Sequence, residues 1–566
     1  MAVPSIEIGF HTDDYMILGF LARSYPGSPP WYDLYNFAPG GASDTQALIA
    51  ASGLPWWTHP ELKLHLFRPL ASALLTIERL VFGSAPLGYH LVSIALYLAL
   101  IAAVGRLFRK VLPGATAALA LLLFAVNEDH ATPFGWIACQ HLLLATLSTV
   151  LGLLAWLRYN EEGWRSGRYC GPLGIGIGLL GSEAALGGAA YWVAYQLTGP
   201  ARPGVAAGWR ARLLRASPVL GLLAYFAVYR AIDGGAANSS MYVDPLSNPG
   251  EFARAAAERL PILLGNALAL VPSGLSITQP KVPFILAGLT ASACVALLYR
   301  ACLPFILDEE RAALRWLVPG AVMALVTTLG GFPGARLLFP SNIGFAPLFA
   351  VLLVRGLRRG PSPWTSSLGR RAGAALLGVL HLALAPCLLI IGTRAHARLA
   401  RKVEDAARNA EIGAAPGQRV FVAAASDPMA AEYPRAVFAV ESPGALSCWS
   451  NLSMAKAAHH LTRTGLSSFT LTPVGSTLLA GPFETVYRSP ASPLPAGERF
   501  IQCGATIRIL AVEEGRPARV EVDLGAPLED PGLVILAWRE GRLRRIAPPL
   551  VGETLELPWS PGPLGL

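Results

Sequence analysis

Long apolar stretches without charged residues fill the middle of the chain. They cover residues 91–105, 111–126, 131–157, 169–182, 184–201, 216–229, 260–280, 282–299, 316–335, 337–354 and 372–393. A membrane-spanning helix needs roughly 20 mostly apolar residues, so the shorter runs must be tilted or include flanking residues. The pattern predicts a polytopic α-helical membrane protein with about ten spans.

The pattern changes after residue 394. Residues 394–411 are polar and favour a helix, which predicts a stalk. Segments rich in Val, Ile, Phe and Thr then predict strands at 419–424, 436–440, 468–472, 506–512, 518–524 and 532–538. Residues 452–463 predict an inserted helix, on which His459 and His460 form a surface pair because neighbours on a helix point in different directions.

Composition supports three parts with different surroundings. Charged residues make up 14% of the chain, and the mean hydropathy is +0.46, whereas soluble domains carry about 25% charged residues. We predict an outer-face segment with juxtamembrane helices at 1–87, a transmembrane helical domain at 88–393 and a β-rich, sandwich-like soluble domain at 394–566. The net charge of +9 comes largely from loop arginines, so it predicts contact with membrane lipid and no nucleic-acid partner.

Basic clusters between the apolar runs predict the orientation. They are Arg106/Arg109/Lys110, Arg158/Arg165/Arg168, Arg202/Arg210/Arg212/Arg215, Arg300/Arg311/Arg315 and Arg355/Arg358/Arg359/Arg370/Arg371. All of them face the cytoplasm if 169–201 forms two short spans that turn near Glu183 and if 251–280 lies along the outer surface. Residues 1–87 and 394–566 are then outside. Because no span precedes residues 1–87, we expect that a first helix is missing upstream.

The cysteines form no Cys-x-x-Cys motif, and the residue usage is typical of GC-rich bacterial coding. Five of the seven cysteines lie in or just beside apolar runs and are expected to be small core residues, namely Cys139, Cys170, Cys294, Cys302 and Cys387. Cys448 and Cys503 lie in the soluble part. They can pair in an oxidising compartment, although their spacing alone does not establish the geometry.

Candidate chemistry begins at Asp13 and Asp14, which lie in Gly-Phe-His-Thr-Asp-Asp-Tyr. Adjacent carboxylates raise the pKa of one another, so one of them can act as a base near neutral pH. The structural alternative is a helix cap, because Thr12-Asp13-Asp14 also has the residue types of an N-terminal cap. The sequence contains no P-loop and no Gly-x-Ser-x-Gly motif, which removes several enzyme classes.

Other polar residues fall at predicted outer turns or interfaces. Arg68 and His90 could hold a lipid phosphate or anchor the interface, and Arg336 could bind phosphate through both nitrogens or extend to the interface. Glu183 interrupts an apolar stretch, so it has either a functional role or a place in a turn. His130, in Asn-Glu-Asp-His, could support a site or belong to a solvated loop.

Taken in order, these pieces resemble the GT-C superfamily of membrane glycosyltransferases, and the nearest subgroup is the protein O-mannosyltransferase-like enzymes. The resemblance covers about residues 6 to 355. It rests on Asp13-Asp14-Tyr15, Phe67-Arg68-Pro69-Leu70, Phe82-Gly83, Gly88-Tyr89-His90-Leu91-Val92, His130, Trp136, Ser182-Glu183 and Arg336-Leu337-Leu338-Phe339-Pro340-Ser341. The chain departs from the family at Ser182, Thr132 and Gln140, where Lys, Glu and Arg are expected.

The resemblance implies an inverting glycosyltransferase that uses a polyprenyl-phosphate-linked sugar and a protein, lipid or glycan acceptor. Transfer would occur on the outer face of the bacterial inner membrane. Asp13 or Asp14 would activate the acceptor, and Arg336 would bind the lipid phosphate. From the residues themselves, Arg68 and His90 join the phosphate site. Glu183 and His130 are assigned supporting roles.

We assign no metal ligands, and a divalent cation stays open as a cofactor. Two other classes compete with the enzyme. A non-catalytic scaffold or binding protein of cell-envelope glycan assembly would use the same groove and the same outer domain. A transporter ranks last, because the sequence has no internal repeat and few charges at the predicted membrane midplane.

Overall fold

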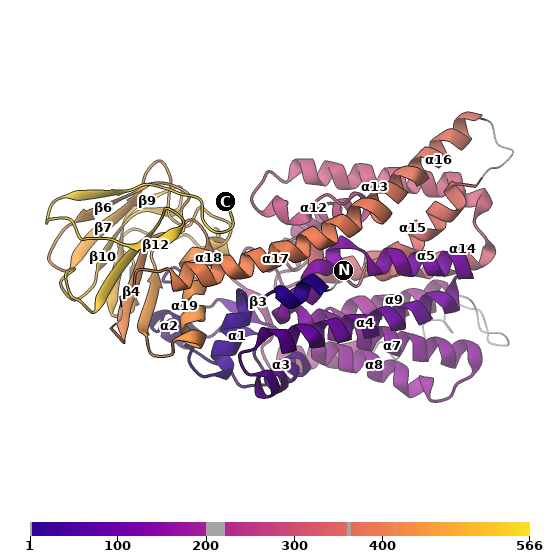
Figure 1. Cartoon of the computed structure of the whole chain (residues 1–566), viewed down its shortest axis with the longest axis horizontal. Coiled ribbons are helices and arrows are strands. Elements are labelled where there is room, and N and C mark those ends of the chain that lie inside the picture. The colour runs from indigo at the N-terminus through magenta and orange to yellow at the C-terminus, as the bar shows by residue number, and fades with distance from the viewer. Residues whose placement is uncertain (1–2, 200–220, 359–363, 414, 566) are drawn as a thin grey trace.

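The computed structural model describes residues 3–199, 221–358, 364–413 and 415–565. A helical bundle forms one end of the molecule and a β-rich part the other, and helix α17 runs between them (Figure 1). The helices on the bundle side are α4 (Pro86–Val111), α5 (Gly114–Ala125), α6 (Ala131–Gly135), α7 (Gln140–Glu162), α8 (Gly167–Gly181), α9 (Ala185–Thr198), α11 (Gly221–Ala231), α12 (Pro249–Ala269), α13 (Val282–Cys302), α14 (Asp308–Thr328), α15 (Asn342–Gly356), α16 (Trp364–Gly378) and α17 (Ala385–Arg408).

Within the described ranges, four helices are long and apolar enough to cross a membrane. They are Pro86–Val111, Ile137–Glu162, Val282–Phe305 and Leu368–Arg408. Helices α8, α9 and α15 have 15, 14 and 15 residues, which is fewer than the roughly 20 that a span needs. The membrane-helical class therefore holds, whereas the count of about ten spans stays a prediction.

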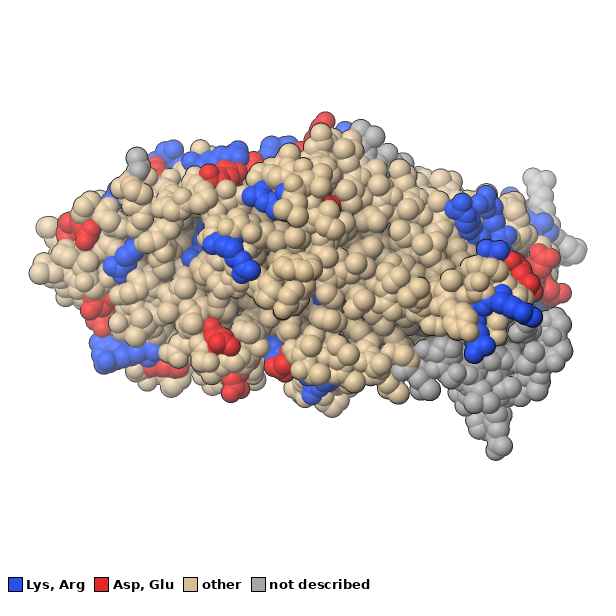
Figure 2. Space-filling view, turned by 90° about the horizontal axis from the view of Figure 1, so that it is seen from below, with Lys and Arg blue, Asp and Glu red and all other residues tan. Residues whose placement is uncertain are grey.

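Charged side chains are unevenly spread over the surface. Figure 2 shows them over the β-rich part and at the far end of the bundle, with a mostly uncharged surface between these regions. Such a band is what a helical bundle presents to lipid. The predicted domain boundary at residue 394 falls inside the continuous helix Leu368–Arg408, so the last apolar helix and the predicted stalk are a single element.

Helices α8 and α9 form the hairpin predicted from the apolar runs, and Glu183 lies in the turn between them. Two glycines let α8 lie directly against α7. A Cβ added to Gly174 would lie 2.6 Å from the Cα of Gly152, so larger residues at this crossing would push the helices apart. The close contact fixes the position of the turn that carries Glu183.

The first part of the chain is small and lies at the junction of the two ends. It contains α1 (Asp13–Leu21), β1 (Asn36–Pro39), α2 (Ala42–Ala50), β2 (Lys63–His65) and α3 (Pro69–Phe82). Strands β1 and β2 form a three-stranded antiparallel sheet with β3 (Gly235–Ala237). Buried Ile17 and Leu18 of α1 share a hydrophobic cluster with Val403 of α17 and Val437 of the C-terminal part. Helix α1 is therefore packed against both.

The C-terminal part contains two sheets. A six-stranded antiparallel sheet has the order β13-β6-β7-β10-β9-β8, and a four-stranded mixed sheet has the order β12-β11-β4-β5. The strands are β4 (Gln418–Ala424), β5 (Leu446–Asn451), β6 (His459–Arg463), β7 (Ser468–Pro473), β8 (Arg499–Gln502), β9 (Ala505–Glu513), β10 (Arg516–Asp523), β11 (Leu533–Arg539), β12 (Arg542–Arg545) and β13 (Thr554–Leu557). Residues of both sheets contribute to one hydrophobic core.

Two predicted elements of this part are wrong. The predicted strand 436–440 lies inside helix α19 (Tyr433–Glu441), which follows the short helix α18 (Pro428–Ala431). The reason is topological: β4 and β5 are parallel, and a parallel pair needs a crossover, usually a helix. The predicted helix 452–463 instead contains strand β6, so neighbouring side chains alternate between the two faces. His459 is buried and only His460 is exposed.

Candidate active site

A cavity of about 270 Å³ lies where the N-terminal segment meets the loops of the bundle. Four of the residues singled out in the sequence line it, namely Asp13, Arg68, Glu183 and Arg336. They come from segments far apart in the chain that were all predicted to lie at one membrane face. Aromatic side chains make up much of the remaining wall, including Tyr35, Phe37, Trp136, Tyr225, Phe226, Tyr229 and Tyr242. Such a wall suits the face of a sugar ring or an isoprenoid chain.

Asp13 and Asp14 have different surroundings, although they are adjacent. Asp13 is partly exposed and lines the cavity, where its Oδ1 accepts a 2.7 Å hydrogen bond from the hydroxyl of Tyr433. Asp14 is 2% exposed. Its carboxylate accepts the backbone N–H of Ala138 at 2.7 Å and that of His11 at 3.1 Å. Asp14 thus joins the start of α1 to the segment that leads into α7.

The capping interpretation of this segment is only partly realised. Helix α1 begins at Asp13, and Thr12 makes no side-chain hydrogen bond as its cap. The backbone carbonyls of His11 and Thr12 accept the N–H groups of Asp14 and Tyr15 instead. This leaves Asp13 as the carboxylate of the pair that faces the cavity.

Burial raises the pKa of Asp13. The hydrogen bond from Tyr433 and the positive charges of Arg336 and Arg68 act in the opposite direction. The pKa of Asp14 is raised well above its ordinary value, also because the carboxyl is buried. A carboxylate whose pKa is raised toward neutral is a better proton acceptor than an ordinary aspartate.

Arg68 and Glu183 form an ion pair in the cavity wall. The Arg68 Nε donates to Glu183 Oε2 at 2.8 Å, and a second nitrogen bonds Oε1. The guanidinium also lies 4.8 Å from the centre of the Tyr35 ring. Burial by itself raises the pKa of Glu183. The charge of Arg68, its hydrogen bonds to the carboxylate and smaller effects of His141 and the backbone together outweigh burial and lower that pKa to about 2. The pair is therefore charged, and its two charges largely cancel.

Arg336 is the cavity-lining arginine that stays uncompensated. It lies in the turn Ala335–Leu338, and its guanidinium carbon is 4.2 Å from the centre of the Phe332 ring. Among the described residues, no carboxylate lies within ion-pair distance of it. Arginine with free donors facing a cavity is suited to bind an oxyanion such as phosphate.

His90 and His130 lie outside this cavity. His90 is fully buried in α4, with its ring beside the backbone of Ile8 and Gly9. The Nδ1 of His130 is 2.8 Å from the hydroxyl of Tyr97, and its ring packs between Phe124 and Phe339. Neither histidine lines the cavity. The predicted donor-binding role of His90 and the predicted supporting role of His130 stay predictions.

The polar cluster around His130 connects the turn before α6 to helices α12 and α15 and does not line the cavity. The carboxylate of Asp129 accepts hydrogen bonds from the amides of Asn266 and Asn342. No group of three or more His, Cys, Asp or Glu side chains within the described ranges is arranged to hold a metal ion. The divalent cation considered from the sequence stays untested.

Sequence reasoning missed Tyr433 and the tyrosines of the cavity wall. Tyr433 begins helix α19 of the C-terminal part and is 420 residues along the chain from its partner Asp13. No local motif marks it. The aromatic residues Tyr225 and Tyr229 are four apart on α11, a spacing that places them on one helix face and that offered a usable signal.

No protein-family model matches the sequence, and no curated protein matches it at a significant level. Three solved structures are similar in part. The crystal structure of the apo oligosaccharyltransferase of Archaeoglobus fulgidus aligns with 13% identity and a TM-score of 0.38, over 79% of this chain and 61% of that chain. The second is the archaeal oligosaccharyltransferase AglB from Archaeoglobus fulgidus in complex with an inhibitory peptide and a dolichol-phosphate. It aligns with 13% identity and a TM-score of 0.37, over 78% of this chain and 61% of that chain.

The third structure is ArnT from Cupriavidus metallidurans bound to undecaprenyl phosphate, with 14% identity and a TM-score of 0.33, over 77% of this chain and 88% of that chain. The chain spans about three-fifths of the length of the archaeal enzyme. Identities and TM-scores at this level do not assign the chain to a family. The residues of the cavity therefore have to carry the functional interpretation.

Proposed function

We propose that the chain is a membrane glycosyltransferase that moves a sugar from a polyprenyl-phosphate donor to the hydroxyl of an acceptor. The observation that carries the proposal is that two complementary groups line the same cavity. They are a partly exposed carboxylate, Asp13, and Arg336, which has no carboxylate partner among the described residues. A base and an oxyanion-binding cation are the two groups that such a transfer needs.

In the proposed reaction, Asp13 accepts the proton of the acceptor hydroxyl as its oxygen attacks the anomeric carbon. The new carbon–oxygen bond forms while the bond between that carbon and the lipid phosphate oxygen breaks. The phosphate leaves with the electron pair, and Arg336 stabilises its additional negative charge. A single displacement of this kind inverts the anomeric configuration, in agreement with the inverting reaction expected from the sequence.

The Arg68–Glu183 pair has a supporting role in this proposal. Because Glu183 already neutralises Arg68, the pair adds little net charge for a phosphate. It holds the turn between α8 and α9 against the segment before α3 and keeps the Tyr35 ring in the cavity wall. We assign Asp14 a structural role as well, since both of its oxygens accept hydrogen bonds from backbone N–H groups.

The cellular setting is part of the proposal. The Cys448–Cys503 disulfide is typical of an oxidising compartment, and the arginine clusters favour the same outer location for the C-terminal part. Both support a bacterial inner-membrane protein whose cavity opens outward. The finer assignment to protein O-mannosyltransferase-like enzymes, with a protein, lipid or glycan acceptor, rests on the sequence resemblance.

The test measures donor binding and transfer separately. Purified full-length chain in detergent is titrated with undecaprenyl phosphate, and native membranes, which contain the acceptor, are supplied with labelled mannosyl-polyprenyl phosphate. We expect Arg336→Gln to weaken lipid-phosphate binding by roughly 10- to 100-fold. Asp13→Asn should keep binding and lower transfer by about 10²- to 10⁴-fold.

Arg79→Gln is the matched control, because Arg79 bonds Ser84 in an exposed position away from the cavity. This variant should change neither the lipid-phosphate affinity nor the transfer rate. Unchanged transfer by Asp13→Asn would remove the proposed base. A different outcome is that the chain binds the lipid phosphate through Arg336 and consumes no sugar-loaded donor. That result would favour the alternative, a non-catalytic binding protein of envelope-glycan assembly.

A further inference from the structure

A second, open cleft of about 610 Å³ lies between the N-terminal segment and the C-terminal part. Its walls come from residues 23–26 and 50–51 on one side and from β4, α19, β5 and the turn after β8 on the other. None of its lining residues also lines the cavity that contains Asp13. Ligand binding at this cleft would therefore be independent of the proposed glycosyltransferase function.

The cleft carries an uncompensated positive charge. Three arginines line it, Arg23, Arg419 and Arg435, and none of the lining residues is Asp or Glu. Among the described residues, no carboxylate lies within ion-pair distance of any of the three. Other arginines of the same domain do form such pairs, for example Arg463 with Glu529.

Backbone carbonyls hold two of these guanidinium groups in place. Arg419 donates from Nε to the carbonyl of Cys503 at 2.8 Å and from a terminal nitrogen to the carbonyl of Leu524 at 2.9 Å. Arg435 donates to the carbonyls of Ser52 at 2.6 Å and Ala51 at 2.9 Å. Each guanidinium has five N–H donors, so both keep free donors after these bonds are made.

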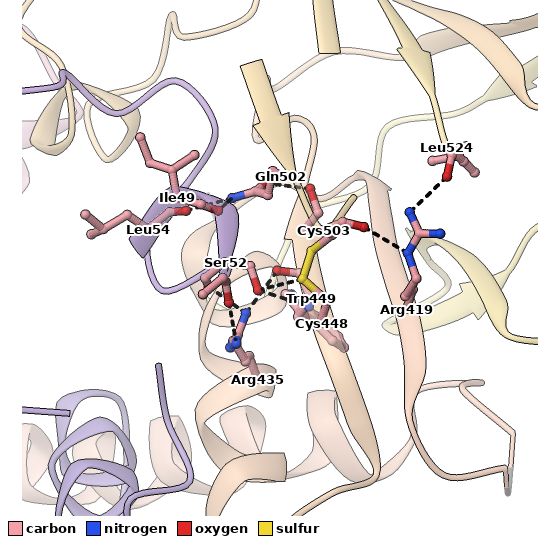
Figure 3. The surroundings of a disulfide bond; sticks show 12 residues. Ile49, Ser52, Leu54, Arg419, Arg435, Cys448, Trp449, Gln502, Cys503 and Leu524 are labelled. Carbon is pink, nitrogen blue, oxygen red and sulfur yellow. Dashed lines mark hydrogen bonds between the residues drawn. A yellow bond between two sulfur atoms is a disulfide. The ribbon is translucent and has the colours of Figure 1, made fainter. Parts of the chain in front are cut away.

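The floor between them is rigid. Figure 3 shows Arg419 and Arg435 on either side of the Cys448–Cys503 disulfide, which joins β5 of one sheet to the end of β8 in the other. The Ser52 hydroxyl bonds both the Cys448 sulfur and the backbone N–H of Trp449, each at 3.2 Å. Charged donors fixed on a rigid floor lose little entropy when a ligand binds.

Burial of Arg435 without an ion-paired carboxylate among the described residues carries an electrostatic cost that an anion would reduce. Arg435 is half-buried and lies 5.3 Å from the centre of the Tyr25 ring. Burial lowers its pKa. Tyr25 and then Glu432, which lies outside the cleft lining, only partly oppose this effect. A cation that leaves water is stabilised by a paired, hydrogen-bonded anion.

We propose that this arginine cleft, lined by Arg23, Arg419 and Arg435, binds a ligand through its oxyanion groups. Carboxylate and phosphate both match the planar donors of arginine, and the volume is within the range of sites for small ligands. The ligand chemistry is therefore an oxyanion, carried either by an acidic saccharide or by a phosphate-bearing compound, on the surface that the C-terminal part presents beside α1.

The experiment titrates the full-length chain in detergent, under non-reducing conditions, with two probes. Trigalacturonate represents carboxylates on a saccharide, and pyrophosphate represents the phosphate source. The informative variant is Arg23→Gln, because Arg23 is exposed and bonds only the carbonyl of Ser28 among the described residues. Its matched control is Arg106→Gln, an exposed arginine that bonds the carbonyl of Ala102 in the bundle.

We expect at least one probe to bind with an affinity that falls as salt is added. Arg23→Gln should weaken binding about two- to fivefold, whereas Arg106→Gln should leave it unchanged, and the probe that binds tighter identifies the source of the oxyanion. Arg435→Lys should weaken binding further if the variant folds. Three outcomes would overturn the proposal. Neither probe binds; or Arg23→Gln binds the probe as tightly as the wild type; or Arg23→Gln and Arg106→Gln weaken probe binding equally.

Discussion

The hydroxyl of Tyr433 donates a 2.7 Å hydrogen bond to Oδ1 of Asp13 across a sequence separation of 420 residues. Tyr433 begins helix α19, and Asp13 begins helix α1, whose Tyr15 bonds Glu404 of α17 at 2.8 Å. The C-terminal part therefore contacts the carboxylate that the proposed reaction uses as its base. This bond stabilises the charged form of Asp13 and fixes one of its oxygens, which leaves the other for an acceptor.

Replacing Tyr433 by Phe should move the pH dependence of transfer. Removal of the hydrogen bond raises the pKa of Asp13, because this bond acts against the effect of burial. The base works only when it is deprotonated, so activity should be lost at a higher pH as the medium is acidified. The other groups that interact electrostatically with Asp13 stay in place. They are Arg336, Arg68, Asp14, Tyr25, Cys139, Tyr242 and Tyr487.

The measurement is the pH profile of kcat/KM for sugar transfer by the full-length chain. Tyr15→Phe is the matched control, since it also removes a tyrosine hydroxyl from the packing of α1. The hydroxyl of Tyr15 bonds Glu404 and not Asp13. The control should lower stability without moving the acidic limb. An identical shift in both variants would mean that Tyr433 acts only through the packing of α1.

Asp14→Ala should damage stability rather than chemistry. The substitution leaves the N–H groups of Ala138 and His11 without their acceptor, and each buried unpaired donor costs about 1–3 kcal/mol. We expect the free energy of unfolding to fall by roughly 2–4 kcal/mol, while kcat/KM per folded molecule changes by less than about tenfold. Thermal unfolding and transfer by the folded fraction check this; a stable but inactive variant would return the base to Asp14.

Apolar runs and single charges were enough to predict several parts of this arrangement. The α8–α9 hairpin follows from two apolar runs interrupted by Glu183, since a charge in such a stretch is stable at a turn or with a partner. Arg336 was identified because no other charge occurs between Arg315 and Arg355. The convergence of Asp13, Glu183 and Arg336 on one cavity agrees with the predicted assignment of their loops to one membrane face.

Contacts between distant segments had no such signal. The Tyr433–Asp13 bond and the choice of Asp13 over Asp14 depend on how α1 packs on α19, and neither residue type nor spacing encodes that packing. The segment 436–440 is rich in Val and Ala and fits a strand by itself. The parallel pairing of β4 with β5 requires a crossover connection between them, and the chain forms it with helix α19. Tertiary context decided the structure in both places.

The Cys448–Cys503 disulfide should make a large contribution to the stability of the C-terminal part. Its Cα atoms are 5.6 Å apart, and the bond closes a sequence separation of 55 residues. Loop-closure entropy of the unfolded chain then predicts a loss of about 4 kcal/mol on its removal. Cys448→Ser with Cys503→Ser should become sensitive to protease at a lower temperature, whereas Cys170→Ser, at an exposed free thiol, should not; equal sensitivity of both variants would contradict this.

The Arg68–Glu183 pair should make stability depend on acid. The pKa of Glu183 is lowered to about 2 from an ordinary value of 4.5, so its stabilisation is present above pH 4.5 and is lost as the pH falls toward 2. Glu183→Gln should cost about 1–2 kcal/mol, less than a fully buried pair, because the Glu183 side chain is 37% exposed. The double variant Arg68→Gln/Glu183→Gln should lose less free energy of unfolding than the sum of the losses in Arg68→Gln and Glu183→Gln. Additive losses from thermal unfolding at neutral pH would mean that the pair does not couple the α8–α9 turn to the segment before α3.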